Sequence, residues 1–121
     1  MQLTLRSEEC LEISEQHEGD VVVLGPVGRL NNETSPEFQS RLLGCVGSAG
    51  ASVLVDLSKV DYMSSAGLRA LMTASKQSKA TGGRLAVAGL NAVVKEIFAI
   101  SRFSYVVTVY DTPAQALAAL R

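Results

Sequence analysis

Short runs of apolar residues alternate along the chain with segments in which apolar side chains recur every three or four positions. The runs are rich in β-branched residues and are bounded by turn-forming residues, which favours strands. The periodic segments favour amphipathic helices. The pattern predicts strands over residues 11–18, 21–30, 53–57, 84–90 and 105–110. It predicts helices from residue 36 up to Gly47, from residue 64 or 65 to about 79, after Asn91, and over residues 114–120.

Local signals mark several of these boundaries. Gly19-Asp20 predicts a turn that joins the first two strands in a hairpin, and Gly25-Pro26 predicts a bend or break in the second strand. Ser35 is expected to cap the first helix, with Pro36 at its first position. Asn91 is expected to cap the third helix, because a side-chain oxygen there can accept a hydrogen bond from an unpaired helix amide.

The order of these elements is strand, strand, helix, strand, helix, strand, helix, strand, helix. Strands separated by single helices favour parallel pairing, whereas the opening hairpin adds an antiparallel strand at the edge. We therefore predict a single α/β domain over residues 1–121, with a mixed, mostly parallel sheet of about five strands and about four helices.

The composition of the 121 residues is that of a globular protein, with 47% hydrophobic and 19% charged residues. With 11 basic and 12 acidic residues the net charge is −1, which disfavours a role in binding nucleic acid. No apolar run approaches the roughly 20 residues needed to span a bilayer, and the first residues lack the apolar core of a signal peptide. We therefore expect a cytoplasmic protein that does not insert into membranes.

The chain offers few residues for metal binding or nucleophilic catalysis. Cys10 and Cys45, both expected to be reduced thiols, lack metal-ligand spacing, and His17 is the only histidine in the sequence. A zinc site would need more ligands, and a serine nucleophile would need a base beside it. We expect no metal, no cofactor and no enzymatic activity, although a small-molecule pocket would leave no short motif in the sequence.

Residues 53–71 carry the most informative pattern in the chain. A buried strand ends in Asp56 and Ser58, and a helix is expected to begin near Ser64 or Ser65. A serine in this position has an ordinary structural use, since its oxygen can accept a hydrogen bond from a helix amide. It can also carry a phosphoryl group, because unpaired amides and the helix dipole favour negative charge there. The position alone leaves both interpretations open.

The segment Asp56-Leu57-Ser58…Tyr62-Met63-Ser64-Ser65-Ala66-Gly67-Leu68 resembles the signature of the STAS family, which includes the anti-sigma factor antagonists and domains of sulphate transporters. In its regulatory members, the serine two positions before the glycine is phosphorylated by a partner kinase. That serine corresponds to Ser65. Ser64 stands where sporulation and stress-response members often have Asp, and it is the alternative phosphorylation site. The resemblance covers nearly the whole chain and implies the same fold.

The resemblance also implies a partner-binding surface. Gly28-Arg29-Leu30 matches the family's segment before the first helix, and Asn31 stands where an acid is usual. Relatives place this loop beside the phosphoserine, on the surface that meets the kinase, although Asn31 and Asn32 can also simply form a turn. The residues expected to take part in partner binding are Asn31, Asp56, Ser58, Met63, Ser64, Gly67 and Arg69.

The function that the resemblance implies is that of an anti-sigma factor antagonist. The unphosphorylated protein would bind an ATP-binding anti-sigma factor serine kinase, and phosphorylation of Ser65 would abolish the complex. The alternative is an unphosphorylated STAS scaffold or interaction subunit of a transporter or signalling complex. An enzyme that uses Ser65 as a nucleophile is disfavoured, because no histidine lies in a matching loop. The partner kinase, the sigma factor and homodimer formation stay open.

Overall fold

The computed structural model describes residues 12–103 and 107–120. Within these residues the chain forms ten helices and strands in the predicted α/β order, with one added strand. The strands are β1 (Glu12–Glu18), β2 (Val21–Leu30), β3 (Ser52–Asp56), β4 (Val60–Met63), β5 (Arg84–Ala88) and β6 (Thr108–Tyr110). The helices are α1 (Ser35–Val46), α2 (Ser65–Ala80), α3 (Ala92–Ile100) and α4 (Pro113–Leu120).

The six described strands form one sheet of order β1-β2-β3-β5-β6, and β4 pairs with β2 outside this path. β1 runs antiparallel to β2, with Glu18 opposite Val21, as the predicted hairpin requires. The other pairings are all parallel within the described strands. The prediction of a mixed, mostly parallel sheet with helices on its faces is confirmed.

Strand β4 is the element that the sequence pattern did not predict. The polar crossing expected between the central strand and its helix is instead a four-residue strand. Asp61 and Tyr62, its middle residues, are exposed, so the segment shows neither strict alternation nor an apolar run. It pairs with the end of β2 over Gly28 to Leu30, past the last pairing of β2 with β3. Only the position of β2 makes this segment a strand.

β2 has the predicted bounds and is not broken at Gly25-Pro26, whereas the cap of α1 differs from the prediction. β2 continues through Gly25-Pro26, because these residues lie where β2 passes from β3 to β4 and has no partner on that side. Helix α1 begins at Ser35, and the residue in its cap position is Thr34, which makes no side-chain capping bond. The expected Ser35 cap was therefore wrong by one residue. Cys10, Leu11 and residues 105–106 of the predicted last strand lie outside the described residues.

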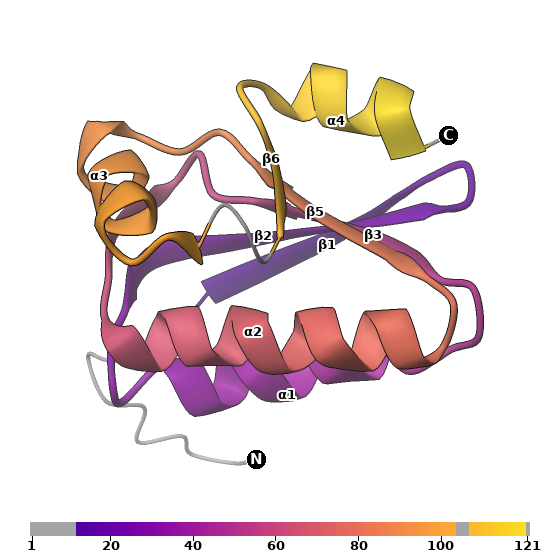
Figure 1. Cartoon of the computed structure of the whole chain (residues 1–121), viewed down its shortest axis with the longest axis horizontal. Helices are drawn as coiled ribbons and strands as arrows, with labels where there is room; N and C mark the ends of the chain where they lie inside the picture. Colours follow the sequence, from indigo (N-terminus) through magenta and orange to yellow (C-terminus); the bar gives the residue numbers. More distant parts are fainter. Residues whose placement is uncertain (1–11, 104–106, 121) are drawn as a thin grey trace, which may run out of the picture.

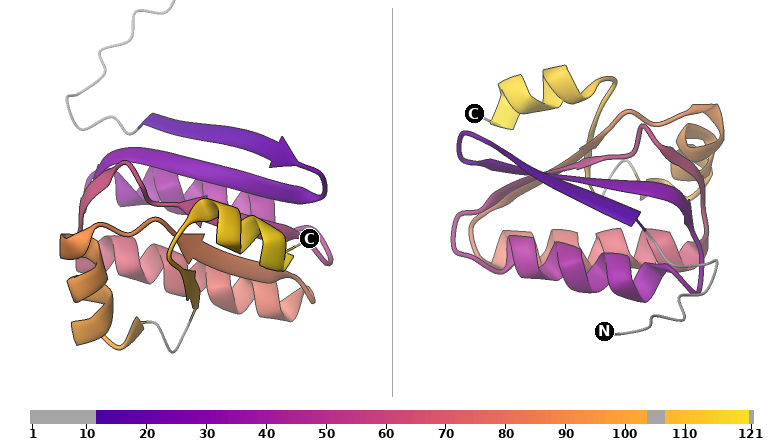
Figure 2. Two further views of the ribbon diagram at one scale, coloured as in Figure 1. Left: turned by 90° about the horizontal axis from the view of Figure 1, so that it is seen from above. Right: turned by 180° about the vertical axis from the view of Figure 1, so that it is seen from behind.

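The helices cover the two faces of the sheet unequally. α1 and α2 lie side by side on one face and begin at the same end of the molecule, whereas α4 lies on the opposite face (Figures 1 and 2). The larger core fills the space between the sheet and the α1–α2 pair and includes Phe38, Leu42, Val55 and Leu71. A smaller core lies beneath α4 and includes Val21, Leu54, Ala86, Ala88, Ala116 and Leu120.

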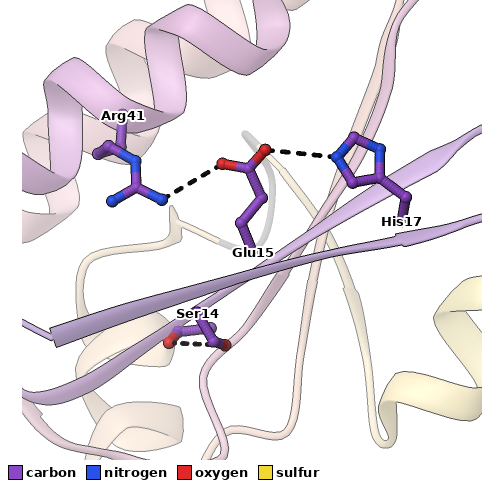
Figure 3. A network of polar contacts seen from close by, with 5 residues as sticks. Ser14, Glu15, His17 and Arg41 are labelled. Atoms are coloured by element: carbon purple, nitrogen blue, oxygen red, sulfur yellow. Dashed lines mark hydrogen bonds and ion pairs between the residues drawn. The ribbon is translucent and has the colours of Figure 1, made fainter.

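The edge strand β1 is linked to α1 by a small polar network (Figure 3). One Glu15 oxygen lies 3.2 Å from the Arg41 guanidinium, and the other lies 3.4 Å from His17 Nε2. These side chains are exposed, so the contacts add at most about 1 kcal/mol each. Burial raises the pKa of the neighbouring free thiol of Cys45, and the Glu15 charge raises it further, whereas Arg41 lowers it. The thiol is therefore kept neutral at pH 7.

Asn91 joins α3 to the strand that the sequence did not predict. Its Oδ1 accepts a hydrogen bond of 2.8 Å from the Val94 amide, which confirms the expected helix cap. Its Nδ2 donates a bond of 2.9 Å to the Val60 carbonyl in β4. The Asn91 side chain thus provides a hydrogen-bond partner for an amide at the start of α3 and for a carbonyl of β4.

We expect Asn91→Ala to lower the free energy of unfolding by about 2 kcal/mol, because both hydrogen bonds are lost. Asn91→Ser keeps a capping oxygen but cannot reach Val60, so about 1 kcal/mol should be lost. Equilibrium unfolding in urea measures both values, and Asn32→Ala in an exposed turn is the control. Equal stability of the Ala and Ser variants would contradict the role of Asn91 as a cap.

Candidate functional site

The amino end of α2 brings the two adjacent serines into different environments. Ser64 is the cap residue, with an extended backbone at φ −86° and ψ 177°. Its hydroxyl oxygen accepts a hydrogen bond of 3.2 Å from the Ala66 amide. Its own amide donates a bond of 2.8 Å to the Leu30 carbonyl at the end of β2. Ser64 is half-buried and has the structural role of a helix cap.

Ser65 is the first residue of α2, and its side chain is exposed. Within the described part of the chain no hydrogen bond engages its hydroxyl. The position also lies at the positive end of the helix dipole, where amides lack intrahelical partners. Ser65 therefore presents a hydroxyl to solvent at a place that tolerates added negative charge.

Gly67 sets how closely the first turn of α2 approaches β2. A Cβ atom on Gly67 would lie 2.7 Å from Met63 Cγ and 3.0 Å from Leu30 Cβ. Gly67 is buried and Met63 is 1% exposed. Both were expected to take part in partner binding, and in this structure they lie beneath the serines rather than on the surface. They act by positioning the turn that carries Ser65.

The loop between β2 and α1 is held by the side chain of Asn31. Asn31 Oδ1 accepts hydrogen bonds from the amides of Glu33, at 2.9 Å, and Thr34, at 3.0 Å. The Thr34 hydroxyl donates to the Arg29 carbonyl at 2.7 Å and accepts from the Asn31 amide at 3.0 Å. Asn31 thus has the turn-forming role that the sequence left open, and the Ser64 bond to Leu30 places this loop next to the start of α2.

Asp56 and Ser58 hold the turn between β3 and β4. Asp56 Oδ1 accepts hydrogen bonds from the Ser58 amide at 3.0 Å and the Ser58 hydroxyl at 2.5 Å. Gly89, at φ +79°, passes so close that a Cβ there would lie 2.3 Å from Ser58 Oγ. The side-chain hydrogen bonds of this pair lie within the turn, and in the described part of the chain none of them reaches Ser65.

A shallow groove runs between the amino ends of α1 and α2. Its volume is about 480 Å³, and it contains one basic residue and no acidic residue among the described residues that line it. The lining residues are Asn32, Ser35, Pro36, Gln39, Ser40, Leu43, Ala66 and Arg69. Ser35 is 3% exposed, and its hydroxyl has no hydrogen-bond partner in the described part of the chain. Arg69, predicted for partner binding, is exposed at the rim of this groove.

Arg29 and Tyr62 are surface residues that belong to the two family segments but were not expected to contact each other. They face each other in the β2–β4 pairing, and the Arg29 guanidinium carbon lies 5.4 Å from the centroid of the Tyr62 ring. Tyr62 is 39% exposed. No sequence signal could have linked them, because their contact depends on β4.

The described residues contain no group of three metal-ligating side chains, and none of their helices is long and apolar enough to cross a bilayer.

A model of the STAS domain matches residues 12–116 of this chain. The chain belongs to the STAS domain family. Its sequence is 32% identical over 94 residues to BtrV of Bordetella bronchiseptica, which is named as an anti-sigma factor antagonist. The match covers 78% of this chain and 81% of BtrV.

Solved structures of antagonists share the fold at lower sequence identity. An anti-sigma factor antagonist from Mycobacterium paratuberculosis superposes with a TM-score of 0.85 at 20% identity, covering 97% of this chain and 99% of the other. The phosphorylated form of SpoIIAA from Bacillus superposes with a TM-score of 0.67 at 15% identity, covering 91% and 100%. This STAS chain is therefore homologous to anti-sigma factor antagonists, and the predicted fold is confirmed.

We expect Gly67→Ala to lower the free energy of unfolding by about 1–3 kcal/mol, because the new methyl group overlaps buried atoms of Met63 and Leu30. Gly44→Ala is the matched control. Gly44 lies inside α1, is exposed and has no atom within 4 Å of an added Cβ, so the same change should stabilise the protein by about 0.5–1 kcal/mol. Urea unfolding of both variants measures the contrast. Stabilisation by both substitutions would show that Gly67 is not required by close packing.

Proposed function

We propose that this STAS protein is an anti-sigma factor antagonist whose binding to an anti-sigma factor kinase is controlled by phosphorylation of Ser65. The observation that carries the proposal is the exposed hydroxyl at the first residue of α2, at the position of the family's phosphorylated serine. The neighbouring hydroxyl of Ser64 accepts the Ala66 amide and is half-buried. This difference favours Ser65 over Ser64 as the modified residue. The proposal implies action in the cytoplasm, where ATP is available.

The chemical step is transfer of the γ-phosphoryl group of ATP to Ser65. A bond forms between Ser65 Oγ and the γ-phosphorus, and the bond from that phosphorus to the β–γ bridging oxygen breaks. ADP leaves, and the hydroxyl proton passes to a base. Serine needs such a base to become a good nucleophile, and the kinase supplies it in this proposal. The protein itself is the substrate and has no catalytic role.

The amino end of α2 allows the modification without loss of the fold. A phosphoserine adds close to two negative charges and three acceptor oxygens. At the start of a helix this charge is favoured by the dipole and by free amides. The phosphoryl group would extend from the exposed side chain of Ser65, whereas Met63 and Gly67 are buried. The modification therefore acts on the surface that a partner contacts.

The same charge opposes the complex that forms around a neutral serine. A partner surface that fits a hydroxyl would have to desolvate a dianion, and acidic groups on that surface would repel it. A difference of ~3 kcal/mol weakens binding by about two powers of ten. We propose that the docking surface comprises the Asn31 loop, Ser64, Ser65 and Arg69. Asp56, Ser58, Met63 and Gly67 give this surface its shape.

A second function keeps the fold without the phosphorylation switch. Asn31 and Ser64 stand where relatives often carry acids, and both side chains form local hydrogen bonds. A surface without those charges suits a constitutive interaction subunit of a transporter or signalling complex. Intact mass measurement after incubation with ATP and the partner kinase separates the two, because the subunit would gain no phosphoryl group.

We expect the wild-type protein and Ser65→Ala to retain an ATP-binding kinase from a lysate of the source cells, and Ser65→Asp to bind it about 100-fold more weakly. With that kinase and ATP, wild type and Ser64→Ala should each gain one phosphoryl group, whereas Ser65→Ala should gain none. Calorimetry and intact mass measure the two effects. Binding by Ser65→Asp as strong as that by Ser65→Ala would refute the proposed switch.

A further inference from the structure

The second turn of α2 carries a basic side chain, Arg69, on the same face of the helix as Ser65. Arg69 follows Ser65 by four residues in a continuous helix, Ser65–Ala80. Residues four apart in a helix are neighbours on its surface. Both side chains are exposed. A group attached to Ser65 Oγ and the Arg69 guanidinium can therefore approach each other without a change in the backbone.

Arg69 has no acidic partner among the described residues. The ion pairs found in that part of the chain join Glu15 to His17 and to Arg41. Arg29, on β2, lies over the Tyr62 ring. Lys76 belongs to the same helix and is exposed, but it is 11 residues from Ser65, which is about 16 Å along the axis. The geometry thus singles out one cation for an anion on Ser65.

We propose that Arg69 binds the phosphoryl group on Ser65 within the same chain. This inference rests on the proposed modification of Ser65. An acidic group that precedes a basic one by four residues is the favourable orientation for a helical pair. Arg also presents several donors in a planar arrangement that suits phosphate oxygens. The exposed pair is screened by salt, but the phosphoryl group carries close to two charges.

Pairing of Arg69 with the phosphoryl group would change the proposed docking surface at Arg69 as well as at Ser65. Arg69 is the basic residue among the described residues that line the groove between α1 and α2. When it pairs with the phosphoryl group, its charge is neutralised at the rim of that groove. Phosphorylation then adds a dianion at Ser65 and removes a cation that an acidic partner residue could contact. Arg69 is a positioning residue for the modified state and does not take part in phosphoryl transfer.

The test uses the full chain with phosphoserine installed at position 65 by genetic encoding, so no kinase is needed. Phosphorus NMR over a pH series gives the second pKa of the phosphoryl group, which is ordinarily about 6. A nearby cation favours the dianion and lowers this pKa. We expect the pKa in the wild-type background to be about 0.3–0.6 units below that in Arg69→Gln at low salt, and the difference to shrink at 1 M salt.

Two further variants serve as matched controls. Lys76→Gln removes the same charge from the same helix, and at 0.15 M salt it should leave the pKa at the wild-type value, because about 16 Å is twice the Debye length of about 8 Å. Arg29→Gln should also leave it unchanged. Equal pKa values for wild type and Arg69→Gln, or a rise in Arg29→Gln instead, would overturn the assignment. The outcome is independent of the kinase experiments on Ser65, so either proposal can fail alone.

Discussion

The contact between the first turn of α2 and the last residue of β2 is the constraint on which the rest of the site depends. The Ser64 amide donates to the Leu30 carbonyl at 2.8 Å, and Gly67 leaves no room for a side chain against Leu30 and Met63. These two contacts fix the position of the start of α2 relative to the end of β2. The next residue, Ser65, is thereby directed to the surface. Loss of the close contact would move the hydroxyl together with the helix.

Strand β4 holds the start of α2 against the end of β2. It pairs with the free end of β2 and leads directly into Ser64, so the helix begins beside the loop that Asn31 organises. The Asn91 side chain also stabilises β4, because it donates a hydrogen bond to the Val60 carbonyl. The Asp56–Ser58 turn determines where β4 leaves the central strand. Features from three parts of the chain, around residues 28–34, 56–63 and 91, therefore fix the position of one exposed serine.

The two adjacent serines have different structural roles, and this difference is what the proposed modification of Ser65 requires of a stable fold. Ser64 satisfies the helix end with its own oxygen, so the cap does not depend on Ser65. Ser65 is then free to change its charge at a low cost to the fold, because the surrounding amides and dipole favour an anion. Arg69 lies one turn further along the helix and adds the only charge in the first two turns of α2. The structural role of Ser64 and the proposed regulatory role of Ser65 thus belong to neighbouring residues.

The sequence by itself determined the α/β class, the hairpin, the four helices, the Asn91 cap and the family signature around Ser65, because each rests on local periodicity or turn chemistry. It could not reveal β4, whose four residues form a strand only beside the extended end of β2. It placed the cap of α1 at Ser35, although the Asn31–Thr34 turn begins the helix one residue earlier. The burial of Met63 and Gly67, the Arg29–Tyr62 contact and the groove beside Arg69 were also decided by tertiary structure. Each depends on segments that meet only when the strands pair and the helices pack, and such distances leave no local pattern in the chain.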